Sequence, residues 1–194
     1  VIRTAPEMQK RLARDLLADD VSPATTESLR KHSDHADPVV RRYVLRLLTL
    51  RNDEALGRIE KAAGDTDEAV RVHAFRALRE LPHAEENSEA TAMILRRGFG
   101  DLSAMVRRAA VAASSTQQSE SLILPLLRTL HTTDLADVHL KHSTRTALRD
   151  HLLNERWFRS IAGQARLSMD RLVLADLSLA IKTPAAAEFV ANNI

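Results

Sequence analysis

One short pattern recurs four times along the chain at nearly even spacing. At its centre an apolar residue is followed directly by a basic one, as Val40-Arg41, Val70-Arg71, Val106-Arg107 and Leu140-Lys141. The apolar member stands at positions 40, 70, 106 and 140, so successive copies begin about 30 to 36 residues apart. A period in this range is typical of proteins built from stacked helix pairs. The recurrence therefore limits the possible folds more than any other feature of the sequence.

Each copy of the pattern also carries the signals of a helix start. The residues three positions before the apolar member are Asp37, Asp67, Ser103 and Asp137. These residue types accept hydrogen bonds from free backbone N–H groups in the first turn of a helix. Downstream, apolar residues follow at helical spacing, for example at Val70, Ala74 and Leu78. The pattern predicts four amphipathic helices that begin directly after these caps.

The segments between these helices predict partner helices. We expect them over residues 53–63, 88–97 and 119–131, with an earlier pair over 6–18 and 23–32. Later helices are expected over 155–162 and 168–175, and Thr183-Pro184 begins a last one, with the threonine as cap. One helix pair cannot bury its apolar face alone, so the pairs must stack. The prediction is an all-α, right-handed α-α superhelix of about five to six helix pairs, forming a single domain over residues 1–194.

Composition supports helices and excludes several classes of site. Only 5 glycines and 6 prolines occur, which argues against an all-β chain with many tight turns. There is no cysteine, so disulfides, thiolate nucleophiles and zinc–thiolate sites are excluded. No uninterrupted apolar run is long enough to predict a membrane span. The net charge of +2 is too small by itself to indicate a nucleic-acid partner.

The Asp-x-x-Val-Arg signature at residues 37–41 and 67–71 resembles that of HEAT repeats, and the resemblance extends over roughly residues 20–153. It implies a structural ladder in which the aspartate and the basic residue join neighbouring repeats. The positions assigned to this ladder are Asp37, Arg41, Asp67, Arg71, Arg107, Asp137 and Lys141. Two positions depart from the signature, Ser103 in place of aspartate and Lys141 in place of arginine. We expect a weaker ladder there, because lysine lacks the planar fork of arginine.

A narrower resemblance concerns the last third of the chain. This part is similar to the HEAT segments of large secreted bacterial proteins, which lie between a sorbosone-dehydrogenase-like β-propeller and a cytochrome c domain. The matching residues are Leu140, His142, Arg145, Ala147, Leu148, Thr183, Pro184, Ala186, Ala187 and Phe189. The resemblance implies a non-catalytic module of a larger redox protein in the periplasm or outside the cell. Phe189, Val190 and Ile194 lack a covering helix in the sequence, so we also expect a segment of a longer chain.

The sequence holds no motif that predicts catalysis or a cofactor. His32 and His35, like His139 and His142, are three positions apart, but a zinc site normally needs a third protein ligand. There is no phosphate-binding glycine loop, no nucleophile elbow and no His-Glu dipeptide of the kind used by iron-binding HEAT hydroxylases. We therefore predict no catalytic residue, no metal site and no cofactor.

Basic residues outnumber acidic ones on the four repeat helices. In a HEAT solenoid the second helix of each pair lines the concave surface, so the resemblance implies a positively charged groove. The candidate concave face comprises Arg42, Arg46, Arg76, Arg108, Arg145 and Arg149. Such a face suits an acidic protein, another polyanion or a nucleic-acid backbone. The alternative is that the ladder engages some of the basic residues and that water solvates the others.

The function expected from these features is that of a non-catalytic scaffold that binds or positions a protein partner or a neighbouring domain. One alternative is nucleic-acid or polyanion binding, as in DNA-glycosylase-like HEAT proteins. That chemistry requires aromatic side chains in a basic groove, and we expect Trp157 to pack under a loop instead. A second alternative is a HEAT protein of the phycobilin-lyase type, for which the sequence offers no diagnostic residue.

Overall fold

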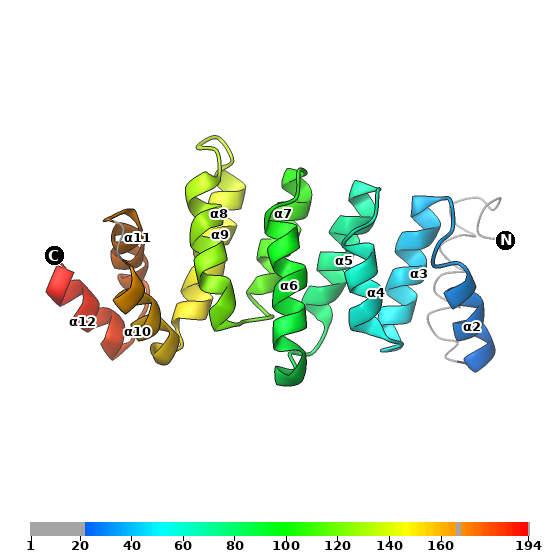
Figure 1. Cartoon of the computed structure of the whole chain (residues 1–194), viewed down its shortest axis with the longest axis horizontal. Coiled ribbons are helices and arrows are strands. Elements are labelled where there is room, and N and C mark those ends of the chain that lie inside the picture. The colour runs from blue at the N-terminus through cyan, green and yellow to red at the C-terminus, as the bar shows by residue number, and fades with distance from the viewer. Residues whose placement is uncertain (1–21, 166–167, 194) are drawn as a thin grey trace. The chain divides into compact units, whose positions relative to one another are not determined.

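The computed structural model describes residues 22–165 and 168–193, and these residues form helices without any strand (Figure 1). The helices are α2 (Pro23–Lys31), α3 (Pro38–Leu50), α4 (Ala55–Ala62), α5 (Glu68–Glu80), η1 (Glu85–Asn87), α6 (Ser88–Phe99), α7 (Ala104–Ser114), η2 (Glu120–Leu122), α8 (Ile123–Thr132), α9 (Val138–Leu152), α10 (Glu155–Gln164), α11 (Ser168–Ser178) and α12 (Pro184–Asn193). The all-α prediction is confirmed. The predicted helix over 6–18 lies outside the described residues.

The chain divides into two compact units, of which the first ends at Leu81 and the second begins at Pro82. In the first unit, α3 packs against α2, α4 and α5, and α4 packs against α5. The predicted caps are confirmed here, because a carboxylate oxygen of Asp37 accepts from the backbone N–H of Val39 and one of Asp67 accepts from that of Val70. Apolar residues at helical spacing form the core, among them Val44 and Leu48 of α3 and Phe75 of α5.

Helix α4 begins two residues later than predicted. The residue before it, Glu54, has left-handed backbone angles with φ of 49°, and Asn52 has φ of 54°. Residues in this region cannot continue a right-handed helix. Asp53, which the pattern suggests as an entry residue, instead binds Arg30 of α2 and Arg58 of α4 with its carboxylate. The start of α4 is thus set by ion pairs with neighbouring helices rather than by a side-chain cap.

In the second unit, α6 packs against α7, α7 and α8 pack against α9, and α12 packs against α10 and α11. The caps Ser103 and Asp137 accept hydrogen bonds from the first turns of α7 and α9, and the predicted cap Thr183 does so for α12. Phe158 and Phe189 meet edge to face, with ring centroids 5.7 Å apart, and join α10 to α12. The predicted helix over 119–131 is divided into η2 and α8.

Both units therefore consist of the stacked helix pairs that the repeat predicts, as in an α-α solenoid. None of the described helices combines the length and the apolar content that crossing a lipid bilayer requires. A single repeat domain over residues 1–194 stays a prediction.

Candidate binding surface

Three arginines of the repeat fold back onto the loop before their own helix. The Nη1 group of Arg41 donates to the carbonyl oxygens of His35 and Ala36, at 2.8 and 3.1 Å. Arg71 makes the same bonds to Asp65 and Thr66, and Arg107 makes them to Asp101 and Leu102. We call Arg41, Arg71 and Arg107 the loop-binding arginines. They satisfy backbone acceptors that would otherwise need water, and so fix the turn between the two helices of a pair.

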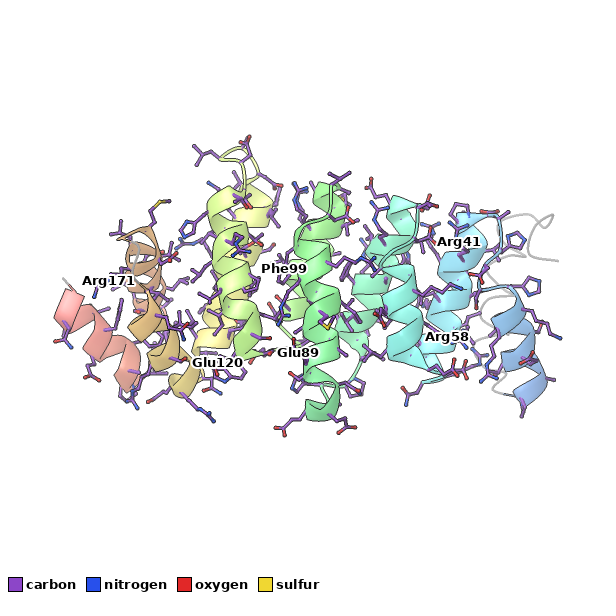
Figure 2. All side chains as sticks on the ribbon, viewed as in Figure 1. Arg41, Arg58, Glu89, Phe99, Glu120 and Arg171 are labelled. Atoms are coloured by element: carbon purple, nitrogen blue, oxygen red, sulfur yellow. The ribbon has the colours of Figure 1, made fainter. Side chains whose placement is uncertain are left out.

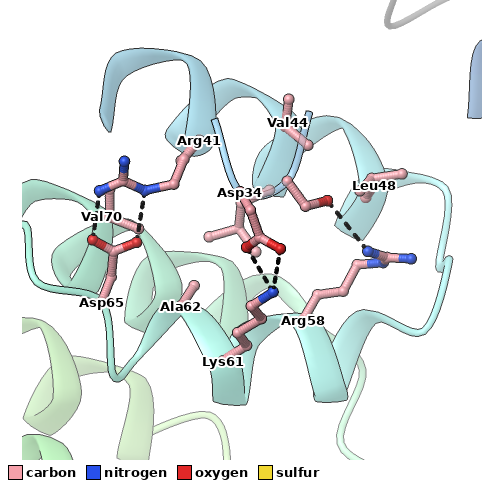
Figure 3. A pocket seen from close by; sticks show the side chains of 11 residues that line it. Asp34, Arg41, Val44, Leu48, Arg58, Lys61, Ala62, Asp65 and Val70 are labelled. Carbon is pink, nitrogen blue, oxygen red and sulfur yellow. Dashed lines mark hydrogen bonds and ion pairs between the residues drawn. The ribbon is translucent and has the colours of Figure 1, made fainter. Parts of the chain in front are cut away.

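Arg41 also joins two repeats of the first unit. Its Nε and Nη2 atoms donate to the two carboxylate oxygens of Asp65, at 2.8 and 2.7 Å (Figures 2 and 3). Burial alone would raise the pKa of Asp65, but hydrogen bonds from Arg41 and from the backbone N–H of Asp67 hold that pKa below its usual range. The two side chains are only about 15% exposed. The arginine therefore reaches the next repeat through Asp65, a residue outside the positions predicted for the ladder.

In the second unit the residues of the predicted concave face are paired with aspartates. Arg108 of α7 donates to Asp137, the cap of α9, at 2.7 Å, and Arg145 of α9 pairs with Asp176 of α11. Arg149 pairs with its neighbour Asp150 at 2.8 Å. The ammonium group of Lys141 forms no hydrogen bond or ion pair with the residues that the structure describes. The inter-repeat ladder stays a proposal, and the described contacts between repeats are the pairs Arg41–Asp65, Arg108–Asp137 and Arg145–Asp176.

A small cavity lies between α3 and α4, with a volume of about 80 Å³ (Figure 3). Val44, Leu45 and Leu48 contribute apolar walls, and charged side chains stand around them. These charges are already paired, Arg41 with Asp65, Lys61 with Asp34 and Arg58 with Asp53. A volume of this size has room for a few water molecules, whereas pockets for organic ligands start at roughly 300 Å³.

The other three residues of the predicted concave face form a group in the first unit. Arg42 and Arg46 stand one turn apart on α3, and Arg76 stands on the neighbouring helix α5. No carboxylate of the described residues pairs with any of these three guanidinium groups, and α3 contains no acidic residue. We call Arg42, Arg46 and Arg76 the basic face. Counted from the basic residue of each repeat, Arg46 and Arg76 occupy the same position, where α7 has Ala112 and α9 has Thr146.

His73 lies among the three arginines of the basic face. Its Nδ1 atom is 2.9 Å from the carbonyl oxygen of Ala69, which can only accept, so Nδ1 carries a proton. Burial lowers the pKa of His73, and the positive charges of Arg42, Arg76 and Arg46 lower it further. The ring is therefore neutral at pH 7, and its Nε2 atom has no hydrogen-bond partner among the described residues.

The sequence analysis also considered a metal site and an aromatic surface for nucleic-acid bases. Within residues 22–165 and 168–193 there is no group of three or more histidine, aspartate and glutamate side chains that could hold a metal ion. His32 and His35 stack on each other at the turn after α2, with ring centroids 6.2 Å apart. Phe75, Phe99, Phe158 and Phe189 are buried, and Trp157 packs near His151. The aromatic rings of α3 and α5 are Tyr43, which is half-buried, and Phe75, which is buried.

Sequence reasoning missed three residues that matter at these sites. Asp65 and Asp101 stand two positions before a cap, and each accepts a hydrogen bond from the cap's own backbone N–H, at 2.8 Å in both cases. The spacing Asp-x-Asp or Asp-x-Ser ahead of a repeat helix is visible in the sequence and identifies such turns. His73 had no comparable signal, because its position among arginines depends on how α3 and α5 pack.

A family model for HEAT repeats matches residues 22–115, which include α2 to α7. No curated protein matches the chain. The narrower resemblance of the last third to secreted redox proteins stays a prediction. HEAT repeats generally act as scaffolds for protein interactions and are typically non-catalytic. Residues 22–115 therefore consist of HEAT repeats.

Proposed function

We propose that this chain is a non-catalytic scaffold that binds a protein partner, and that the basic face on α3 and α5 receives an acidic segment of that partner. The observation that carries the proposal is the contrast between two sets of arginines. Arg42, Arg46 and Arg76 have no carboxylate partner among the described residues, whereas Arg108, Arg145 and Arg149 are each paired with an aspartate. Unpaired arginines grouped on adjacent helices attract negative charge from outside the molecule.

The position of the basic face suits this role. In HEAT proteins the second helix of each pair lines the concave side, and α3 and α5 are second helices of their pairs. Arginine is preferred for carboxylate recognition because its planar fork donates two parallel hydrogen bonds. A neighbouring domain of a longer secreted protein, which the narrower resemblance implies, is one source of such an acidic segment.

Nucleic-acid binding is less well supported. A duplex is held by many phosphate contacts along its length, but the basic residues of the second unit are engaged by aspartates. Recognition of an exposed base needs an aromatic platform, and the described phenylalanines are all buried.

Two matched triple variants test the proposal. The first replaces Arg42, Arg46 and Arg76 with glutamine, and the second makes the same replacement at Arg108, Arg145 and Arg149. Both lose the same formal charge, so a difference between them reports local contacts rather than net charge. Binding of a fluorescein-labelled oligoglutamate peptide at low salt should weaken about tenfold or more in the first variant and change little in the second.

Two further measurements complete the experiment, namely the salt dependence of peptide affinity and the binding of duplex DNA. The affinity of the unmodified protein should fall steeply as salt rises, because the contacts are exposed charge pairs. Equal losses in the two triple variants, or no binding of the peptide at low salt, would contradict the proposal. Tighter binding of duplex DNA than of the peptide would assign the face to nucleic acid. Circular dichroism melts of both variants verify that they remain folded.

A further inference from the structure

The basic face presents more positive charge than one carboxylate can neutralise, and His73 lies beside it. Arg42 and Arg46 come from α3, and Arg76 and His73 come from α5, with His73 one turn before Arg76. The only hydrogen bond that His73 makes within the described residues runs through Nδ1 to Ala69, which orients the ring and leaves Nε2 without a partner. Three guanidinium groups and one imidazole nitrogen are therefore available to a single anion.

A phosphate monoester fits this group better than a carboxylate does. It carries close to two negative charges at neutral pH and presents three terminal oxygens, whereas a carboxylate carries one charge on two oxygens. Arginine clusters are the usual partners of phosphorylated side chains, because each guanidinium donates to two oxygens at once. Three guanidinium groups, each with several N–H donors, can together engage all three terminal oxygens of such a group.

We propose that Arg42, Arg46, Arg76 and His73 form a binding site for a phosphorylated serine or threonine of the protein partner. The inference rests on the proposed function, since it names the chemistry of the segment that the basic face receives. The arginines supply the charge, and His73 supplies a hydrogen-bond donor at Nε2 once it takes up a proton.

Proton uptake follows from the charges around the ring. In the free protein, burial and the three arginines keep His73 neutral. A bound dianion offsets the arginine charges, and Nε2 then faces an acceptor, so protonation becomes favourable. Binding of the phosphate group should therefore raise the pKa of His73. In the free protein, the charges that lower the pKa of His73 are those of Arg42, Arg76 and Arg46.

The binding test uses the full chain and three versions of one peptide, with serine, glutamate or phosphoserine at its centre. The phosphoserine peptide should bind at least about tenfold more tightly than the glutamate peptide. Replacing either Arg46 or Arg76 with glutamine should cost about tenfold in affinity for the phosphopeptide. Arg128→Gln is the matched control, because Arg128 is exposed on α8 and has no acidic partner among the described residues.

His73 is tested separately by NMR of the imidazole nitrogens. With saturating phosphopeptide, the pKa of His73 should rise to or above the ordinary value of about 6.5, and it should stay low with the serine peptide. His73→Gln should reduce the preference for phosphoserine over glutamate. His142→Gln, at an exposed position of α9, should leave the preference unchanged.

The outcomes separate this inference from the proposed function. If the glutamate peptide binds through the basic face but phosphoserine binds no more tightly, the scaffold proposal stands and the phosphate site is wrong. An unchanged pKa of His73 in the bound state would also overturn the site as described. If no peptide binds at low salt, both proposals fail. Duplex DNA that binds as tightly as the phosphopeptide, through the same arginines, would replace the phosphoprotein partner by a nucleic-acid backbone.

Discussion

His151 lies fully buried on α9, and its environment favours one protonation state. Its Nδ1 atom is 2.8 Å from the carbonyl oxygen of Ala147, so that nitrogen carries a proton. Its Nε2 atom is buried and has no hydrogen-bond partner within the described residues. Burial therefore lowers the pKa of His151. A protonated ring would place a charge in an apolar core beside Trp157, and the negative charge of Asp150 offsets that cost only in part.

This arrangement predicts a pH-dependent stability. Because the pKa of His151 is lower in the folded state than in the unfolded state, the unfolded chain binds a proton more readily. The stabilisation is complete above about pH 6.5 and is lost as the pH falls from there toward the folded-state pKa. Urea denaturation between about pH 5 and pH 8 should show this slope, and His151→Gln should flatten it.

His73 requires a control in that experiment, since its pKa is lowered too. Both proteins should therefore carry His73→Gln, so that the remaining difference in slope belongs to His151. Equal slopes with and without His151 would show that the buried ring does not titrate during unfolding.

At the scale of elements, the ion pair between Arg41 and Asp65 joins α3 to the loop before α5. It is bidentate, with both side chains about 15% exposed, so solvent screens it little. A double-mutant cycle with Arg41→Ala and Asp65→Ala should give a coupling energy of about 1–3 kcal/mol. The measurement is the free energy of unfolding in urea for the four proteins.

The pair between Lys61 and Asp34 is the natural control, because it joins α4 to the turn before α3 but is 66% and 74% exposed at its two side chains. Exposed pairs contribute roughly 0–1 kcal/mol. A coupling energy for Arg41 and Asp65 no larger than that of the control would mean that the bidentate geometry adds no stability.

The elements themselves were largely predictable, since they depend on local signals. The caps Asp37, Asp67, Ser103 and Asp137 and the helical spacing of apolar residues identify the second helix of each pair directly. The start of α4 was not predictable, because Asp53 binds Arg30 of another helix and Glu54 adopts left-handed angles. The pairing of Arg108 with Asp137 and of Arg145 with Asp176 depends on helix packing, which a periodic pattern does not encode.

Helix packing also decides which arginines of the predicted concave face belong to the basic face. The sequence showed six arginines at similar places on four helices and gave no basis for dividing them. Arg108 and Arg145 are paired with aspartates further along the chain and Arg149 with the adjacent Asp150, whereas the three arginines of the basic face have no carboxylate partner among the described residues. The contribution of His73 likewise requires the contact between α3 and α5.

At the scale of the whole molecule, the chain forms two compact units that meet in sequence at Leu81 and Pro82. Between Glu80 and Glu85 no residue belongs to a helix, and Pro82 and His83 are exposed. Proline cannot donate a backbone hydrogen bond, and it forces the preceding residue into an extended conformation. Leu81 has φ of −69° and ψ of 144°, in agreement with this rule.

Limited digestion with a non-specific protease should therefore cut first within residues 81–87 and release two fragments, one for each unit. The expected reason is that a protease needs an accessible, extended backbone, and this link provides one. Mass spectrometry of the early fragments gives the site. A first cut in the loop between α8 and α9, or within a helix, would contradict the division of the chain at this point.

The loop-binding arginines also determine where the chain tolerates changes in length. Each of them reaches carbonyl oxygens five and six positions before itself, so an inserted residue in that turn would break both bonds. Among the described residues, this pair of bonds is absent where α7 passes to α8 and where α9 passes to α10. There, only Leu153 and Asn154 separate α9 from α10, whereas residues 115–122 separate α7 from α8. A foreign peptide or an affinity tag inserted between Ser115 and Ser119 would therefore leave the turns of the loop-binding arginines intact. The same insertion between Asp101 and Ser103 would break the bonds from Arg107 to the carbonyl oxygens of Asp101 and Leu102.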